Sequence, residues 1–309
     1  MDNVQRWGIL YCPKHDDFKR NRRWTRIEKS LSDNGVDYDF VQSESVSGVE
    51  RLVRMMVNSG YRTIIIAGGD SALNDAVNCL MNFEIRVRDT VTLGVIPNGT
   101  MNDFSHFWGF KENEIDNAVN SIKERRVKKI DLGCVRYNNS KNESCHRYFL
   151  NCVNMGFIAS VMNLRRKTHR FLGSRTLSFL FSFILMIFQR KEYKMYMKIN
   201  SDVVKRNVMT MCIGNASGYG QTPNAVPYNG QLDVSVVYNS RMTQLFEGIY
   251  LFLKGKFLNH KSVHSYRTQK IDVVEARKVP VGVDGRLIDT PEGAFTVTVE
   301  PEVINFIIP

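Results

Sequence analysis

Apolar and polar positions along the first 130 residues follow two alternating periods. Short runs of consecutive apolar or β-branched residues, such as 63–68 and 91–96, are typical of strands buried on both faces. Between such runs, stretches such as 48–59 place apolar residues three and four positions apart, which predicts amphipathic helices. The predicted order is strand 6–12, helix 22–34, strand 36–43, helix 48–59, strand 63–68, helix 71–81 and strand 91–96. This alternation predicts a doubly wound parallel α/β sheet through about residue 130.

The pattern changes after residue 131, where short segments of alternating polarity dominate. They predict a largely antiparallel β domain, with helices only at about 161–190 and 241–255. The alternating segments are 134–139, 147–153, 194–199, 203–213, 232–239, 269–276 and 295–300. A chain of 309 residues is long enough for two domains, and we place their boundary near residue 131.

The formal net charge of +11 favours an anionic partner, such as nucleotide phosphate, acidic lipid headgroups or nucleic acid. The basic segment 19–24 carries a tryptophan, but no nucleic-acid recognition module surrounds it. We interpret it as a solvated helix face and predict no nucleic-acid partner.

Six scattered cysteines form no CxxC pair and no Cys/His cluster with zinc spacing, so we expect free thiols in a reducing compartment. The first 15 residues lack the features of a secretion signal, which favours a cytoplasmic location.

The most apolar stretch, 177–188, is shorter than the roughly 20 residues that cross a bilayer. Basic residues flank it on both sides: Arg165, Arg166, Lys167 and Arg170 before it, and Arg190, Lys191 and Lys194 after it. The stretch is either an apolar element held against an anionic membrane surface or a buried core helix with solvated ends.

Two glycine-containing turns follow predicted strands, at the sheet edge where ligands bind in parallel α/β folds. The first is Gly68-Gly69-Asp70-Ser71. Its glycines would let the backbone approach a phosphate, and the amides of Ser71 and Ala72 would face the anion. An equally concrete interpretation is a tight turn in which Asp70 only caps the following helix.

The second turn lies within GVIPNGTMNDF, residues 94–104. Gly99 and Thr100 stand where a strand gives way to a helix, although Thr100 and Asp103 also fit a simple capping box. Two such turns on neighbouring strands would line one nucleotide cleft.

These turns and five further segments resemble the diacylglycerol kinase catalytic-domain family, which includes bacterial lipid kinases, sphingosine kinases and ceramide kinases. The family motif GGDGT followed by LNE reads GGDSALND at 68–75, and its GTxNDFA motif reads GTMNDFS at 99–105. The other matches are IDLG at 130–133, FLNCVNMGFIA at 149–159, GNASGYG at 214–220, NGQLDV at 229–234 and VDG at 283–285.

The resemblance implies an α/β nucleotide-binding domain at 1–131, an antiparallel β-sandwich lipid-substrate domain at 132–290, and a segment 291–309 that returns to the first domain. It implies that ATP, bound with Mg²⁺ in the cleft between the domains, phosphorylates a lipid hydroxyl. The acceptor would be diacylglycerol-like or sphingoid, taken at an anionic membrane surface by a cytoplasmic, peripherally associated protein. The resemblance also allows a homodimer.

Individual roles follow from the same resemblance. It assigns catalysis to Asp70 and Asp284 and a structural Mg²⁺ to Asp233 and Asn229. It assigns nucleotide binding to Gly68, Gly69, Ser71, Gly99, Thr100 and Asn102.

The chain also departs from the family motifs. Ser71 replaces a glycine, which would cost about 1 kcal/mol or more if that position needs a positive φ; Ala72 replaces a threonine and removes a possible phosphate contact. Tyr228 and Asn229 replace two aspartates of a Mg²⁺ loop. Arg286 replaces the glutamate proposed as the general base in bacterial members, and arginine cannot accept a proton.

Three explanations for the missing base stay open. Asp70 takes the proton, as is proposed for the matching aspartate of sphingosine-type members; Asp284, Asp289 or Glu292 takes it; or the reaction is lost. The last would leave a weak or inactive relative that acts as a lipid- or nucleotide-binding regulatory module.

An enzyme similar to NAD kinase or phosphofructokinase shares the GGD turn, but it does not explain GTMNDF, GNASGYG or NGQLDV. We prefer the lipid kinase, because phosphoryl transfer depends on positioning and metal more than on one base.

Overall fold

The computed structural model describes residues 6–13, 17–43, 48–99, 102–172, 181–182, 184–185, 189, 191–238, 242–276, 278–291 and 293–309. Contacts divide the chain into two compact units. Unit 1 comprises Met1–Asp131 and Pro301–Pro309, and unit 2 comprises Leu132–Glu300. The chain passes from unit 1 to unit 2 within strand β5 (Val127–Asn138) and returns within β15 (Phe295–Ile307).

Unit 1 is built on a parallel sheet in the order β2-β1-β3-β4, with the last residues of β15 beside β4. Its strands are β1 (Trp7–Tyr11), β2 (Tyr38–Gln42), β3 (Thr63–Gly68) and β4 (Thr92–Pro97). Its helices are α1 (Asp17–Asp33), α2 (Gly48–Asn58), α3 (Asp70–Met81), α4 (Ile85–Arg88), α5 (Asp103–Phe107) and α6 (Ile115–Glu124).

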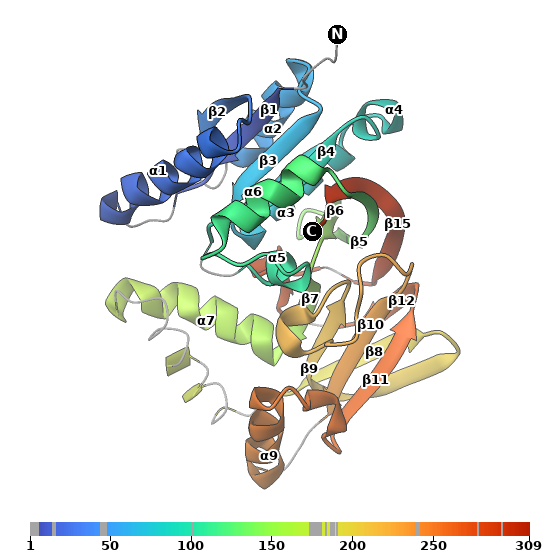
Figure 1. Cartoon of the computed structure of the whole chain (residues 1–309). Coiled ribbons are helices and arrows are strands. Elements are labelled where there is room, and N and C mark those ends of the chain that lie inside the picture. Colours follow the sequence, from blue (N-terminus) through green and yellow to red (C-terminus); the bar gives the residue numbers. More distant parts are fainter. Residues whose placement is uncertain are drawn as a thin grey trace. The chain divides into compact units, whose positions relative to one another are not determined.

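Helices cover both faces of this sheet, as the near-continuous apolar strands require. Figure 1 shows α1 and α6 on one face and α2 and α3 on the other. Every residue of β1, β3 and β4 is buried. The predicted parallel α/β arrangement is therefore confirmed. Helix α1 begins five residues before its predicted start at residue 22, because no glycine or proline stands between Pro13 and that residue.

Unit 2 is an antiparallel β-sandwich domain, as predicted. The strand order is β14-β13-β7-β9-β8-β12-β15, with β10 and β11 attached through β9 and with β6 paired to β5. The strands are β6 (Ser144–Phe149), β7 (Cys152–Gly156), β8 (Tyr193–Ile199), β9 (Asp202–Gly214), β10 (Leu232–Tyr238), β11 (Val263–Thr268), β12 (Lys270–Glu275), β13 (Val281–Val283) and β14 (Arg286–Leu287). The helical elements are α7 (Phe157–Leu172), α9 (Met242–Leu253), η1 (Gly218–Gly220) and η2 (Phe257–Asn259).

The apolar stretch 177–188 lies mostly outside the described residues, so its two interpretations stay open. No helix within the described ranges is both long enough and apolar enough to cross a membrane. All six cysteines are free thiols, as the spacing predicted.

Candidate functional site

The two glycine-containing turns lie together at the carboxyl edge of the unit 1 sheet. Gly68 and Pro97 are neighbours in the β3–β4 register. The backbone N–H of Asn98 donates to the Gly68 carbonyl at 2.8 Å, and the Asn98 side chain donates to the Cys12 carbonyl at 3.3 Å. Three strand ends are therefore tied to one another where the sequence predicted a ligand site.

Asp70 connects the two turns through its carboxylate. One carboxylate oxygen accepts the backbone N–H of Asp103 at 2.9 Å, and the other accepts that of Phe104 at 3.3 Å. The side chain is buried. Asp70 is the first residue of α3, yet it caps the amino-terminal end of α5, the helix of the second turn. A helix cap was one of the two interpretations, but the capped helix is not the one that follows Asp70 in the chain.

The backbone of the first turn differs from what the glycines suggested. Gly69 has an extended conformation, with φ −104° and ψ −178°. A Cβ atom added to Gly68 would stand 3.0 Å from the Cβ of Ala72, so this glycine lets α3 pack closely on the strand end.

The residues that replace the family's glycine and threonine are the second and third residues of α3. Ser71 is exposed there and is not among the positive-φ residues, so the strain that a positive φ would cause is absent. The N–H of Ala72 donates to the Gly69 carbonyl at 2.9 Å, so one of the two amides expected to face an anion is already used.

Asn102 closes the second turn. Its side-chain oxygen accepts the N–H of Gly99 at 2.9 Å, and its side-chain nitrogen donates to the Gly99 carbonyl at 3.1 Å and to the Glu112 carboxylate. Because both N–H bonds of the Asn102 amide are engaged, this buried side chain holds the turn in shape. Thr100 lies outside the described residues.

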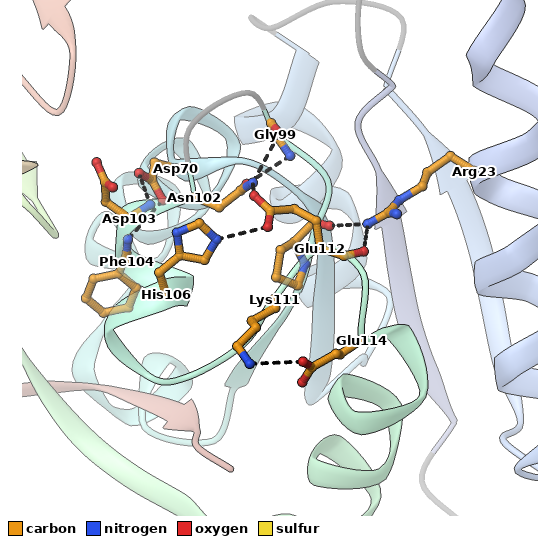
Figure 2. A network of polar contacts seen from close by, with 11 residues as sticks. Arg23, Asp70, Gly99, Asn102, Asp103, Phe104, His106, Lys111, Glu112 and Glu114 are labelled. Carbon is orange, nitrogen blue, oxygen red and sulfur yellow. Dashed lines mark hydrogen bonds and ion pairs between the residues drawn. The ribbon is translucent and has the colours of Figure 1, made fainter.

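Figure 2 shows Glu112 at the centre of the network that supports the second turn. Its carboxylate accepts from Asn102 and lies 3.0 Å from Nε2 of His106. Arg23 donates to the carbonyls of Pro97 and Glu112 and so joins both ends of the segment. Burial by itself would raise the pKa of Glu112, but hydrogen bonds from Asn102 and His106 lower it to about 2. Sequence reasoning missed Glu112, because no short motif contains it.

Glu112→Gln should reduce stability in a pH-dependent way. A carboxylate whose pKa falls from 4.5 to about 2 on folding stabilises the fold above pH 4.5, and this contribution is lost as the pH falls toward 2. About a third of the side chain is exposed, so we expect a loss of no more than about 1 kcal/mol at pH 7 and a smaller loss at pH 2.5. Urea unfolding at both values measures it, with the exposed Glu124→Gln as control. A difference that grows toward low pH would contradict the assignment.

Asp103 and Ser105 are two further polar residues that sequence reasoning did not select as ligands. Oδ2 of Asp103 and Oγ of Ser105 are buried without a hydrogen-bond partner among the described residues. Burial raises the pKa of Asp103. Unpartnered buried oxygens next to the two turns are typical of a site that a ligand completes.

Asp284 is buried in unit 2, in the turn between β13 and β14, with a positive φ of 43°. Its carboxylate accepts three backbone N–H groups, from Leu150 at 2.7 Å and from Asn151 and Cys152 at 2.9 Å. This explains why the predicted strand 147–153 is split into β6 and β7, because the amides of Leu150 and Asn151 turn away from the ladder.

Asn151 is a second polar residue of unit 2 that sequence reasoning left without a role. Its side chain is fully buried, and neither its amide nitrogen nor its amide oxygen has a hydrogen-bond partner among the described residues. The backbone of Asn151 is fixed by Asp284 on one side and by Asn215, whose N–H donates to the Asn151 carbonyl at 2.9 Å, on the other. A fixed, unpartnered amide is again suited to a polar ligand.

Asp233 lies on β10, opposite Arg267 on β11. The guanidinium of Arg267 binds both carboxylate oxygens, at 2.6 and 3.1 Å. The side-chain oxygen of Asn229 accepts the N–H of Gln231 at 2.9 Å. No group of three or more His, Cys, Asp or Glu side chains suited to a metal is found among the described residues. The loop therefore does not fit a Mg²⁺ ion, because an internal cation already occupies the one carboxylate.

Added Mg²⁺ should accordingly leave the thermal stability of the nucleotide-free protein unchanged. Arg267→Met should lower the unfolding temperature, because it leaves the mostly buried Asp233 carboxylate without its partner. Differential scanning calorimetry with 5 mM Mg²⁺ or with EDTA measures both effects, and Arg206→Met in the same unit is the control. A rise in the wild-type unfolding temperature on adding Mg²⁺, reversed by EDTA, would show a metal site at this loop.

Two of the residues weighed in the search for a general base lie at β14. Asp289 is exposed after the strand, and Arg286 is its first residue. Glu292 lies outside the described residues.

Comparisons with known proteins agree with both units. A family model described as the diacylglycerol kinase catalytic domain matches residues 6–135, and one described as the YegS C-terminal NAD kinase beta sandwich-like domain matches 151–308. The diacylglycerol kinase of Staphylococcus carnosus is 25% identical over 286 residues, which cover 91% of this chain and 88% of that protein. The diacylglycerol kinase of Bacillus subtilis is 22% identical over 240 residues, 76% of this chain and 74% of that protein.

Solved structures share the fold at low identity. A diacylglycerol kinase from Bacillus anthracis has a TM-score of 0.69 and 18% identity, with 99% of this chain and 97% of that chain covered. Yeast NADH kinase has a TM-score of 0.58 and 9% identity, with 100% of this chain and 84% of that chain covered. The likeness to NADH kinase extends to the fold alone.

Proposed function

Because the chain belongs to the diacylglycerol kinase catalytic-domain family, we propose that it is a lipid kinase that transfers the γ-phosphoryl group of MgATP to a lipid hydroxyl. One observation carries the proposal. The Asp70 carboxylate fixes the second glycine turn against the first, beside a buried oxygen of Asp103 that has no partner within the described part of the chain. Phosphoryl transfer depends on such positioning of backbone and charge.

In this proposal, residues of both glycine-containing turns of unit 1 bind the nucleotide. We assign the phosphate contacts to the backbone of Gly69 and Gly99 and, from the family motif, to Ser71 and Thr100, whereas Gly68 lets α3 pack closely on the end of β3. Asn102 and Glu112 hold the second turn in the shape that accepts the nucleotide. Mg²⁺ bound to ATP would supply neutralisation of the phosphate charge.

The reaction forms a bond between the lipid hydroxyl oxygen and the γ-phosphorus and breaks the bond from that phosphorus to the β-γ bridging oxygen, so that ADP leaves. The hydroxyl proton passes to a carboxylate. We assign this role to unit 1, to Asp70 or to Asp103, because Arg286 cannot accept a proton and Asp284 already accepts three backbone N–H groups. Of the two, Asp103 is the better candidate, because both oxygens of Asp70 already accept backbone N–H groups, whereas Oδ2 of Asp103 has no partner among the described residues and burial raises the pKa of Asp103.

A second candidate function is a nucleotide- or lipid-binding module with weak or no activity. Arg286 at the position of the family's glutamate favours it. The relaxed backbone of Ser71 argues against it, because the nucleotide turn carries no positive-φ strain.

The test is incubation of the purified protein with labelled ATP, Mg²⁺ and mixed vesicles that contain diacylglycerol, sphingoid bases, ceramide and phosphatidylglycerol. We expect label in one of these lipids, with a diacylglycerol-like or sphingoid acceptor first. Absence of label from all of them would contradict the kinase. A thermal shift with ATP would then separate a nucleotide-binding module from a protein that binds no nucleotide.

The same proposal includes a cytoplasmic enzyme that associates peripherally with an anionic membrane, and it allows a homodimer. The net charge of +11 supports the membrane association.

A further inference from the structure

Helix α9 combines an apolar composition with an exposed position. Eight of its twelve residues, MTQLFEGIYLFL, are apolar, and Glu247 is its only charged residue. Yet none of residues 243–253 is buried. An apolar helix normally buries at least one face in a core, so this exposure points to a surface that something else covers.

Three of the four large exposed side chains of α9 form a single stripe, and the fourth, Phe252, lies outside it. Phe246, Tyr250 and Leu253 follow one another at spacings of four and three residues, which places them on one side of the helix. Their exposed fractions are 59%, 60% and 77%.

The rest of the helix fixes which way this stripe faces. A Cβ atom added to Gly248 would stand 3.7 Å from the His260 ring, and the rings of Phe252 and Phe257 meet at 5.8 Å. Helix α9 therefore packs through Gly248 and Phe252 on the segment that contains η2, and the stripe points away from these contacts.

Lysines follow the stripe directly. Lys254, Lys256 and Lys261 are all exposed. The Lys254 ammonium lies 5.9 Å from the centre of the Tyr250 ring, so positive charge and apolar surface adjoin. An apolar helix face with tyrosine and adjacent lysines suits the headgroup region of an anionic bilayer.

We propose that the α9 stripe, Phe246, Tyr250 and Leu253 with Lys254 and Lys256, docks unit 2 on an anionic lipid surface. The proposal rests on the proposed function, because a lipid kinase must take its acceptor from a bilayer. A second copy of the chain fits the stripe less well. A twofold contact places the same patch on both partners, and it would bring the lysines of the two copies together.

Flotation with phosphatidylglycerol and phosphatidylcholine vesicles, without ATP, tests the docking surface. Phe246→Ser with Leu253→Ser should weaken binding to phosphatidylglycerol vesicles at least tenfold. Lys254→Gln with Lys256→Gln should weaken it several-fold, reduce its salt dependence and leave binding to phosphatidylcholine unchanged. Val203→Ser removes a side chain of unit 2 that is also well exposed, and it should change nothing.

Two results would overturn the proposal. One is equal vesicle binding by the stripe variant and by Val203→Ser. The other is a change from dimer to monomer in the stripe variant, seen by sedimentation velocity, with vesicle binding unchanged, which would assign the stripe to contact between copies.

A soluble substrate separates this test from that of the proposed function. The stripe variant should phosphorylate a short-chain diacylglycerol, dissolved as monomers, as fast as the wild type does. If neither the wild type nor any variant phosphorylates a lipid, the proposed kinase function is rejected. Vesicle binding then still tests the proposed docking surface.

Discussion

Asp70→Asn should reduce phosphorylation of the lipid acceptor at least 100-fold. The asparagine has the same shape but only one oxygen, so its NH₂ group would face the N–H of Asp103 or Phe104. One buried donor then loses its acceptor, at about 1 to 3 kcal/mol, and α5 moves relative to the first turn. Small displacements of positioning groups are enough for losses of this order. If Asp70 also takes the hydroxyl proton, a further loss follows.

The measurement combines kcat/KM for ATP with hydrogen–deuterium exchange of the 102–108 segment. We expect faster exchange at the start of α5 together with the loss of activity. Asp89→Asn, which removes an exposed carboxylate paired with Lys129 in the same unit, is the control and should leave both unchanged. Full activity in Asp70→Asn would exclude Asp70 as proton acceptor and as the link between the turns.

The companion variant Asp103→Asn distinguishes the two carboxylates of unit 1. It removes the only charge of Asp103 without touching its backbone N–H, which is the group that Asp70 binds. We expect α5 to keep its exchange protection while activity falls and loses the pH dependence of a titrating carboxylate. If the pH profile of Asp103→Asn is the same as that of the wild type, Asp103 is not the proton acceptor and the role falls to Asp70.

The parallel core of unit 1 was predictable because its strands are buried on both faces. Strands β3 and β4 read as uninterrupted apolar runs, and their observed bounds lie within one residue of the prediction. Both glycine turns follow these strands directly, so their meeting at one sheet edge could be predicted too. Helix α5 has five residues and is too short to show a helical period, so only the turn before it indicated a helix there.

The roles of single side chains depend on contacts that no local pattern contains. Asp70 lies 33 residues before the first amide that it caps, and Asp233 lies 34 residues before the arginine that binds it. The second contact exists only because β10 and β11 pair in one register. The family motif marked Asp233 as a cation ligand but could not reveal that the cation is a guanidinium of the same chain.

Asp284→Asn should strongly destabilise unit 2. The carboxylate accepts three buried N–H groups, whereas an asparagine has one oxygen and an NH₂ group that would face one of these donors. We expect a loss of about 2 to 4 kcal/mol in the free energy of unfolding. The substitution is well matched to its position, because asparagine tolerates the positive φ of 43° as aspartate does.

Exchange of individual amides locates this effect and separates an anchoring role from a catalytic one. The segment 150–152 should lose protection at least tenfold in Asp284→Asn, because its three N–H groups no longer share two carboxylate oxygens. Asp272→Asn, which removes an exposed carboxylate paired with Lys270 in the same unit, should leave that segment protected. Unchanged protection and unfolding free energy together with lost activity would instead make Asp284 a catalytic group. If protection and stability are both lost, the role of Asp284 is to hold Asn151 in position, whose side-chain amide has no partner in the parts of the chain that the structure describes.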